Sequence, residues 1–162
     1  EILAIGGLSE SADEGRAKAE KALSSGQAAE HFARMVAALG GPTDIMEQPA
    51  KHLPTAPVIL GLAPDRTGII TTVDARELGL AIIDLGGGRR RVEDNIDYSV
   101  GLSEVAAIGE SVGPERPLCI VHAASDADAE RAGSAIRAAV TIGDKAPTPA
   151  PTVRQRIGPP TP

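Results

Sequence analysis

Apolar residues recur with helical spacing over the first forty residues, and this pattern predicts two helices. Ser11 and Glu14 have the spacing of a capping box, so the first helix begins near Ser11 and continues to Leu23. Gly26 stands where a left-handed C-cap is expected. The second helix covers residues 27–39 and carries an apolar stripe that we expect to pack in the core. The stripe consists of Ala28, Phe32, Met35, Val36 and Leu39.

A proline-rich stretch follows over residues 42–57. Its prolines, at positions 42, 49, 54 and 57, allow neither a long helix nor a central strand. We therefore interpret this stretch as a connector between the helical part and the rest of the chain.

The period of the pattern changes after the connector. Residues 58–60 and 68–73 are apolar and β-branched and predict two strands on either side of a turn at 64–65. Asp74 is a suitable N-cap for a helix that continues at least to Leu80. Residues 80–85 fit either the end of that helix or a buried strand.

The last third of the chain predicts short strands followed by one helix. Residues 98–100, 105–108 and 118–122 are β-like runs separated by glycines. Ser125 or Asp126 can cap a final helix that ends near Val140. Its inward-facing residues are expected to be Ala129, Ala132, Ile136, and either Ala139 or Val140.

These elements predict an α+β fold class, in which N-terminal helices precede a β-rich, barrel-sandwich-like C-terminal module closed by a helix. The predicted organisation has three parts: a helical segment over 1–53, the β-rich domain over 54–146 and a proline-rich tail over 147–162. The last residues of the tail, 159–162, are expected to fray.

Composition and charge exclude several function classes. The net charge is −6, and the basic run at 89–91 is followed at once by acidic residues, so we expect no nucleic-acid binding. Phe32 and Tyr98 are the only aromatic residues, which argues against stacking platforms and aromatic cages. No apolar run approaches the roughly 18 residues of a membrane span, and no signal-peptide pattern begins the chain. Because a single cysteine, Cys119, cannot form an internal disulfide, we expect a soluble protein of the reducing cytoplasm, with no membrane partner.

The most distinctive local feature is a run of three glycines and three arginines, made up of Gly86, Gly87, Gly88, Arg89, Arg90 and Arg91. Glycines allow close backbone approach to a ligand and arginines offer forked donors, so an anion site is one interpretation. The run matches neither a P-loop nor a dinucleotide-binding fingerprint. A mobile or structural loop, with its charge balanced by Glu93, Asp94 and Asp97, is the favoured alternative.

No catalytic, metal or cofactor site is predicted from the remaining polar residues. The three histidines, His31, His52 and His122, lie too far apart for a zinc signature, and each is expected to have a structural role. Cys119 lies between apolar neighbours and is expected to pack as a small hydrophobe. The acidic residues at the start of the last helix are explained by capping and the helix dipole; they are Asp126, Asp128 and Glu130.

Several stretches together resemble the C-terminal part of the pyrimidine-nucleoside phosphorylases, closer to the bacterial thymidine-specific branch than to the broader-specificity branch. They lie at 40–44, 53–56, 74–81, 85–90, 94–102, 117–123 and 152–157. The most specific is the block from the Gly-Gly-Gly-Arg-Arg run to the Ile-Asp-Tyr-Ser-Val-Gly sequence. The resemblance covers nearly the whole chain.

The resemblance implies reversible phosphorolysis, in which thymidine and phosphate give thymine and 2-deoxyribose 1-phosphate. It implies a two-domain homodimer without a cofactor, phosphate being a co-substrate. The family's phosphate- and base-binding residues lie in an N-terminal half with no counterpart here, so no residue of this chain is expected to be catalytic. Residues 1–53 then match helices of the family's large α/β domain, and residues 54–146 its C-terminal β-rich domain. The segment 86–95, with Gly86, Gly87, Gly88, Arg89 and Arg90, matches a region near the interdomain cleft and is a candidate closure loop.

The positions of the lysines nearly exclude a third hypothesis, a carrier module, and two accounts of the chain remain. A biotinyl or lipoyl domain needs a lysine on an exposed hairpin, and the four lysines here are Lys18, Lys21, Lys51 and Lys145, with none between 52 and 144. The first account is an inactive C-terminal fragment of a phosphorylase, which also fits a chain that begins with Glu1. The second is a non-catalytic interaction module that docks onto a separate catalytic half.

Overall fold

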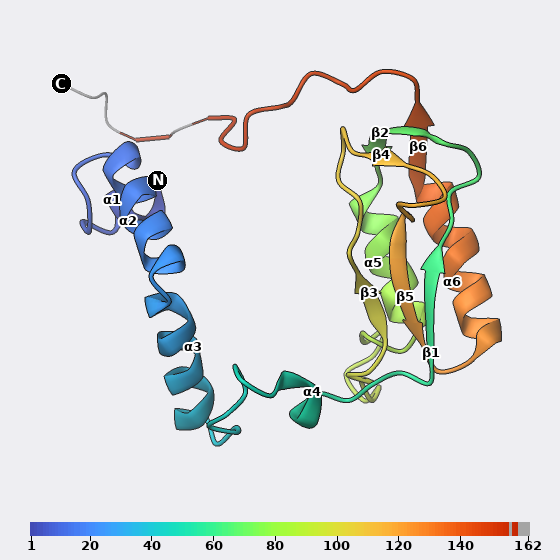
Figure 1. The fold of residues 1–162 in the computed structure, drawn as a ribbon, viewed down its shortest axis with the longest axis horizontal. Helices are drawn as coiled ribbons and strands as arrows, with labels where there is room; N and C mark the ends of the chain where they lie inside the picture. Colours follow the sequence, from blue (N-terminus) through green and yellow to red (C-terminus); the bar gives the residue numbers. More distant parts are fainter. Residues whose placement is uncertain (156, 159–162) are drawn as a thin grey trace. The chain divides into compact units, whose positions relative to one another are not determined.

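The computed structural model describes residues 1–155 and 157–158. The chain divides into two compact units, Glu1–Pro54 and Thr55–Pro162, whose elements are drawn in Figure 1. Position 156 of the resemblance at 152–157, and the fraying predicted for 159–162, lie outside the described residues.

The first unit contains the two predicted helices and two single-turn helices. These are α1 (Ile2–Ile5), α2 (Ala12–Ser24), α3 (Gln27–Ala38) and α4 (Pro49–His52). The predicted cap of α2 is confirmed, because Ser11 Oγ accepts a hydrogen bond from Glu14 N (3.2 Å). The Glu14 carboxylate reaches one residue further back than a capping box requires and accepts from Glu10 N (2.7 Å). Gly26 has the predicted left-handed conformation, with φ +83°.

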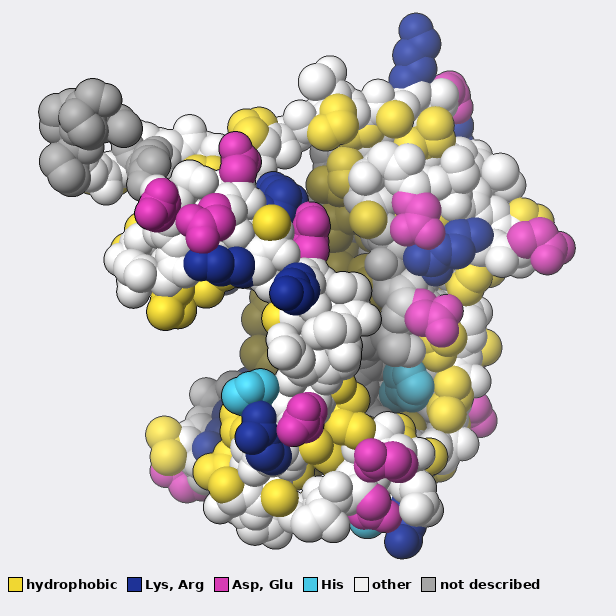
Figure 2. Space-filling model, turned by 60° about the vertical axis from the view of Figure 1, so that its left-hand side comes forward, with side chains coloured by type: hydrophobic (Ala, Val, Ile, Leu, Met, Phe, Trp, Pro, Cys, Tyr) yellow, Lys and Arg dark blue, Asp and Glu magenta, His cyan; other side chains and the backbone are white. Residues whose placement is uncertain are grey.

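The apolar stripe of α3 is not in a core, so that prediction is wrong. Phe32 is 48% exposed, Met35 51% and Leu39 81%. The first unit consists of helices alone, and Gly15 is its one residue in the buried class. A helical stripe is buried only where a second apolar layer lies against it, and this unit supplies none. Hydrophobic side chains also reach the surface at several places on the face drawn in Figure 2.

The second unit is built from two three-stranded antiparallel sheets and two helices. One sheet has the order β1 (Val58–Leu62), β5 (Cys119–Ala123), β3 (Gly101–Ser103). The other has the order β4 (Ser111–Val112), β2 (Gly68–Val73), β6 (Val140–Gly143). The helices are α5 (Ala75–Asp84) and α6 (Asp126–Ala139), which contact each other (Figure 1). The α+β class is confirmed, and neither sheet closes into a barrel.

Several predicted strands have different bounds or partners. Strands β1 and β2 flank the predicted turn but belong to different sheets, and therefore do not pair with each other. Residues 80–84 continue α5 instead of forming a strand, and Leu85 is its C-cap. Neither 98–100 nor 105–108 is a strand. The module does not end with its helix, because β6 follows α6 directly and pairs with β2. Strands of two to four residues carry little local signal and exist because a partner strand accepts their hydrogen bonds.

The core of the second unit lies between its sheets and helices. Strand β5 alternates strictly, with Cys119, Val121 and Ala123 buried and the two residues between them half-buried. The residues predicted to face inward from α6 are confirmed as buried: Ala129, Ala132, Ile136 and Ala139. Within the described residues, no helix combines the length and apolar character needed to cross a lipid bilayer.

Candidate functional site

The glycine–arginine run begins the loop that connects α5 to β3, residues 86–100. This loop contains the segment 86–95 that the sequence predicts as a candidate closure loop, and we use the name closure loop for the whole of 86–100 without assigning it that role here. The loop starts with a Schellman motif at the end of α5, where Gly86 N donates to Ile83 O (3.0 Å) and Gly87 N donates to Ile82 O (2.9 Å). Gly86 has φ +97°, a conformation that other residues adopt only with strain. The first glycine is therefore required by the helix terminus itself.

The next two glycines lie tightly against α5. A Cβ on Gly87 would lie 2.9 Å from Ile82 Cγ2 and 3.3 Å from Val100 O, and a Cβ on Gly88 would lie 2.7 Å from Ile83 Cγ1. The part of the loop that leads back to β3, which we call the return arm (residues 97–100), contacts the start of the loop, since Asp97 N donates to Gly86 O (2.9 Å). The two ends of the loop are thus in contact, as in a compact Ω-loop.

Asp94 organises the arginines inside the closure loop. Its Oδ2 accepts from Arg90 N (3.0 Å) and Arg91 N (2.9 Å), and its carbonyl accepts from Arg89 Nε (3.2 Å). The Arg90 guanidinium forms an ion pair with Asp84, the last residue of α5. Because acceptors within the loop and helix already engage Arg89 and Arg90, these contacts favour the structural interpretation of the run over an anion site.

The return arm of the loop carries a second organised turn. Asp97 Oδ1 accepts from Ser99 Oγ (2.6 Å) and Ser99 N (2.9 Å), and these bonds hold the pKa of the Asp97 carboxyl below its ordinary value. Two large apolar side chains are exposed on the same loop: Val92 is 85% exposed and Tyr98 is 78% exposed. The loop therefore has an ordered base, and it exposes two large apolar side chains among charged ones.

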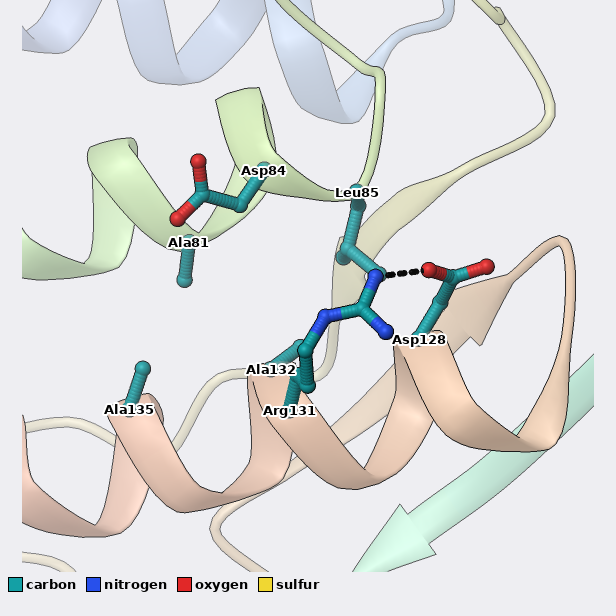
Figure 3. Close-up of a pocket in the computed structure, with 7 residues that line it drawn as sticks. All are labelled: Ala81, Asp84, Leu85, Asp128, Arg131, Ala132 and Ala135. Atoms are coloured by element: carbon teal, nitrogen blue, oxygen red, sulfur yellow. Dashed lines mark hydrogen bonds and ion pairs between the residues drawn. The ribbon is translucent and has the colours of Figure 1, made fainter.

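A hollow of about 300 Å³ lies beside the start of the loop, between α5 and α6 (Figure 3). Its polar lining consists of Asp84 from α5 and of Asp128 and Arg131 from α6. Asp128 Oδ2 accepts from Ser125 Oγ (2.5 Å), and Arg131 pairs with the same carboxylate; these bonds lower its pKa despite partial desolvation. Asp128 therefore stays ionised at neutral pH and is not suited to act as a general acid.

A second hollow of about 240 Å³ lies near the β1–β2 connection and β6. It is lined by Arg66 and Arg137, and each arginine is paired with an exposed carboxylate, Asp144 and Asp65 respectively. Arg137 Nε also donates to Ala63 O (3.1 Å). The local charges cancel, so this hollow gives no net attraction for an ion.

The histidines and the cysteine are not brought together. His52 Nε2 lies 2.6 Å from Asp44 Oδ1 in the connector, and His122 Nε2 lies 2.8 Å from Ser103 Oγ on the first sheet. His31 is exposed on α3. Cys119 is 1% exposed, and burial raises the pKa of its thiol to about 11, so it packs as a small hydrophobe. Across residues 1–155 and 157–158, no three His, Cys, Asp or Glu side chains gather in a way that could hold a metal ion.

Some contacts of the site were not predicted. The Arg90–Asp84 pair and the contacts of Asp94 join residues three to six positions apart, but they form in a loop beyond the end of α5, where helical charge spacing gives no prediction. The Ser103–His122 contact had no local signal either, because its members are 19 residues apart and meet only through strand pairing.

Comparison with known proteins agrees with the sequence resemblance. Residues 69–143 match the family model described as the pyrimidine nucleoside phosphorylase C-terminal domain. The chain is 49% identical over 158 residues to the thymidine phosphorylase of Burkholderia orbicola (strain MC0-3), which covers 98% of the chain and 36% of that protein. It is also 49% identical over 157 residues to the thymidine phosphorylase of Burkholderia cenocepacia (strain HI2424), covering 97% of the chain and 36% of that protein.

The chain thus spans little more than a third of the length of the curated relatives it matches. The matched family domain includes the whole of α5, of the closure loop and of α6. The predicted resemblance is confirmed: the chain is similar to a C-terminal part of the thymidine phosphorylases, and its residues 69–143 match the C-terminal domain of the pyrimidine nucleoside phosphorylases.

Proposed function

We propose that the chain is the C-terminal portion of an enzyme of nucleoside salvage that transfers the deoxyribosyl group of thymidine to phosphate. The reaction gives thymine and 2-deoxyribose 1-phosphate and is reversible. The observation that carries this proposal is the 49% identity to thymidine phosphorylases along 98% of the chain. Thymidine and phosphate are the substrates of the proposal, with no cofactor, in a full enzyme that is a homodimer.

Alone, the chain is proposed to be inactive. Phosphorolysis requires phosphate held in line behind the anomeric carbon and donors that stabilise the departing base. Among the described residues, the arginines that line the two hollows, Arg66, Arg131 and Arg137, are already paired with carboxylates, so neither hollow offers a free guanidinium to a phosphate. The binding of both substrates is therefore assigned to the portion of the relatives that this chain does not span.

The role proposed for this portion is to help close the cleft of the full enzyme through the closure loop. Three properties support it: the loop has a fixed base on α5, exposed apolar residues at Val92 and Tyr98, and a guanidinium, that of Arg90, held by an exposed ion pair. A loop with a fixed base and an exposed tip can contact a second domain while the domain that carries the loop keeps its fold.

The experiment uses a chimera in which this chain replaces the matching region of the Burkholderia orbicola thymidine phosphorylase. Phosphate-dependent release of thymine is measured for the chain alone and for the chimera. We expect no release from the chain and clear release from the chimera. Activity that tracks the purified chain would refute the inactive-portion proposal, and an inactive but folded chimera would refute the assignment to this enzyme.

The loop is tested in the same chimera. Shortening residues 89–94 to two glycines is expected to lower turnover at least tenfold, because closure would be lost. Glu115→Gln, in the turn before β5, is the matched control and is expected to leave turnover unchanged. Unchanged kinetics after the shortening would reject the closure role.

A second candidate function is a non-catalytic module that docks onto a separate catalytic half. The specific observation in its favour is the helical first unit, where large apolar side chains are exposed, among them Ile2, Ile5, Leu8 and Leu39. This candidate predicts that the chain co-purifies with a separately encoded catalytic subunit. Light scattering on the purified chain provides the simpler check, because a clean monomer at high concentration argues against a large docking surface.

A cytoplasmic location is part of the proposal. Its support is Cys119, a free and buried thiol, which is compatible with a reducing compartment.

A further inference from the structure

The closure loop returns to the sheet through an unusually weak element. Strand β3 has three residues and lies at the edge of its sheet, and among the described residues it pairs only with β5. So short an edge strand has few backbone hydrogen bonds to hold it in register. The position of the return arm therefore depends on additional contacts of β3.

One such contact is a side-chain hydrogen bond to the central strand. Ser103 Oγ lies 2.8 Å from His122 Nε2, and both side chains are half-buried. His122 is opposite Gly101 in the strand register, so the bond runs diagonally across the ladder to the last residue of β3. It lies on the face away from the core, because the neighbours of His122 on β5, Val121 and Ala123, are the fully buried ones.

The residue after β3 is held in a strained conformation. Glu104 has φ +51°, and it is the one described non-glycine residue with a positive φ. Its carbonyl accepts a hydrogen bond from Arg116 Nη1 (2.9 Å), and Arg116 Nε donates to Glu110 Oε1 (2.5 Å). The chain is therefore clamped just beyond Ser103, and strain of this kind persists only where surrounding contacts fix it.

We propose that His122 and Ser103 are positioning residues for the closure loop: their hydrogen bond fixes the register of β3 on β5 and so sets where the return arm meets the base at Gly86. The inference rests on the proposed role of the loop for its functional consequence, but the positioning itself is a property of this chain. Val100 connects β3 with the base of the loop, since its carbonyl lies against Gly87 and the next residue, Gly101, begins β3.

The positioning is tested by hydrogen exchange on the full 162-residue chain. Ser103→Ala is expected to speed exchange of the loop amides, including Asp97 N on Gly86 O, about fivefold, the effect of losing one neutral hydrogen bond. Exchange in α6 and in β2 is expected to stay unchanged. Ser103→Thr keeps the hydroxyl and is expected to restore slow exchange.

Ser134→Ala is the matched control, because the Ser134 hydroxyl donates only to Glu130 O (3.0 Å) within α6. We expect it to leave the loop amides unaffected. Unchanged loop exchange in Ser103→Ala, equal acceleration throughout the core, or failure of Ser103→Thr to restore protection would each overturn the inference.

The functional consequence is measured in the active chimera described above. Ser103→Ala and His122→Phe are expected to lower kcat about fivefold while the KM for thymidine changes less than twofold, and Ser103→Thr is expected to recover kcat. A loosened loop with unchanged kcat would overturn the effect of the positioning on turnover. A failure of the proposed closure role can be told apart from a failure of the positioning, because the chimera with residues 89–94 shortened would then keep its kinetics.

Discussion

Arg90 and Asp84 form an ion pair that joins the arginine run to the last residue of α5. The pair is local, since its members are six residues apart, and it holds the first arm of the closure loop to its own helix. Asp84 also lines the hollow between α5 and α6, so the loop and the hollow share a side chain (Figure 3). Both groups are more than half exposed, and such a pair guides conformation more than it adds stability.

Replacement of Gly86 tests the helix terminus. Gly86→Ala places a side chain at φ +97° and is expected to lower the free energy of unfolding by about 1–2 kcal/mol. Urea unfolding followed by far-ultraviolet circular dichroism measures the change. The matched control is Gly79→Ala, inside α5 with open space around it, which is expected to raise stability by up to about 1 kcal/mol. Equal effects of the two substitutions would contradict the requirement for a left-handed residue at position 86.

Loss of the Asp94 carboxylate is expected to open the arginine run to proteolysis. In Asp94→Asn the charged acceptor of Arg90 N and Arg91 N becomes a neutral amide, so local opening becomes easier. Limited digestion with trypsin should cut within 89–91 several-fold faster than in the wild type. Glu93→Gln changes the neighbouring charge without removing these bonds, and an equal increase in that variant would assign the effect to charge alone.

The Asp97 carboxyl gives a pH-dependent reporter of the return arm. Hydrogen bonds from the Ser99 hydroxyl and amide lower its pKa in the folded state. A folded-state pKa below the unfolded value means that the contribution to stability is complete above the unfolded pKa and is lost as the pH falls through the folded one. Ser99→Ala is expected to raise the pKa of Asp97, measured by following its carboxyl carbon in an NMR titration. No change in that variant would show that the Ser99 hydroxyl is not the dominant cause.

Cys119 is expected to be unreactive in the folded protein. It is 1% exposed, and burial raises the pKa of its thiol to about 11, so almost no accessible thiolate exists at pH 8. A thiol-exchange reagent such as dithiobisnitrobenzoate should react at pH 8 only after urea is added. Rapid, complete reaction without denaturant would mean that β5 is accessible.

The resemblance to the phosphorylase family and the starts of the four long helices were predictable because they depend on local signals. The cap of α2 by Ser11 and the buried face of α6 follow from residues within a few positions of each other. The glycine–arginine run was likewise visible as a motif. Its local partner Asp94, a few residues away, was assigned only a balancing charge.

The tertiary structure alone decided which sheet each strand enters and which distant side chains meet. Strands β3 and β4 have three and two residues, too few for a periodic signal, and β1 and β2 separate into different sheets although they flank one turn. Ser103 reaches His122 only because β3 pairs with β5. The sequence by itself thus determined the four long helices, the class of fold and the family resemblance, because nearby residues or whole stretches encode them. The pairing of strands and the exposure of the α3 stripe depend on which surfaces meet in space, and periodicity along one segment does not specify that.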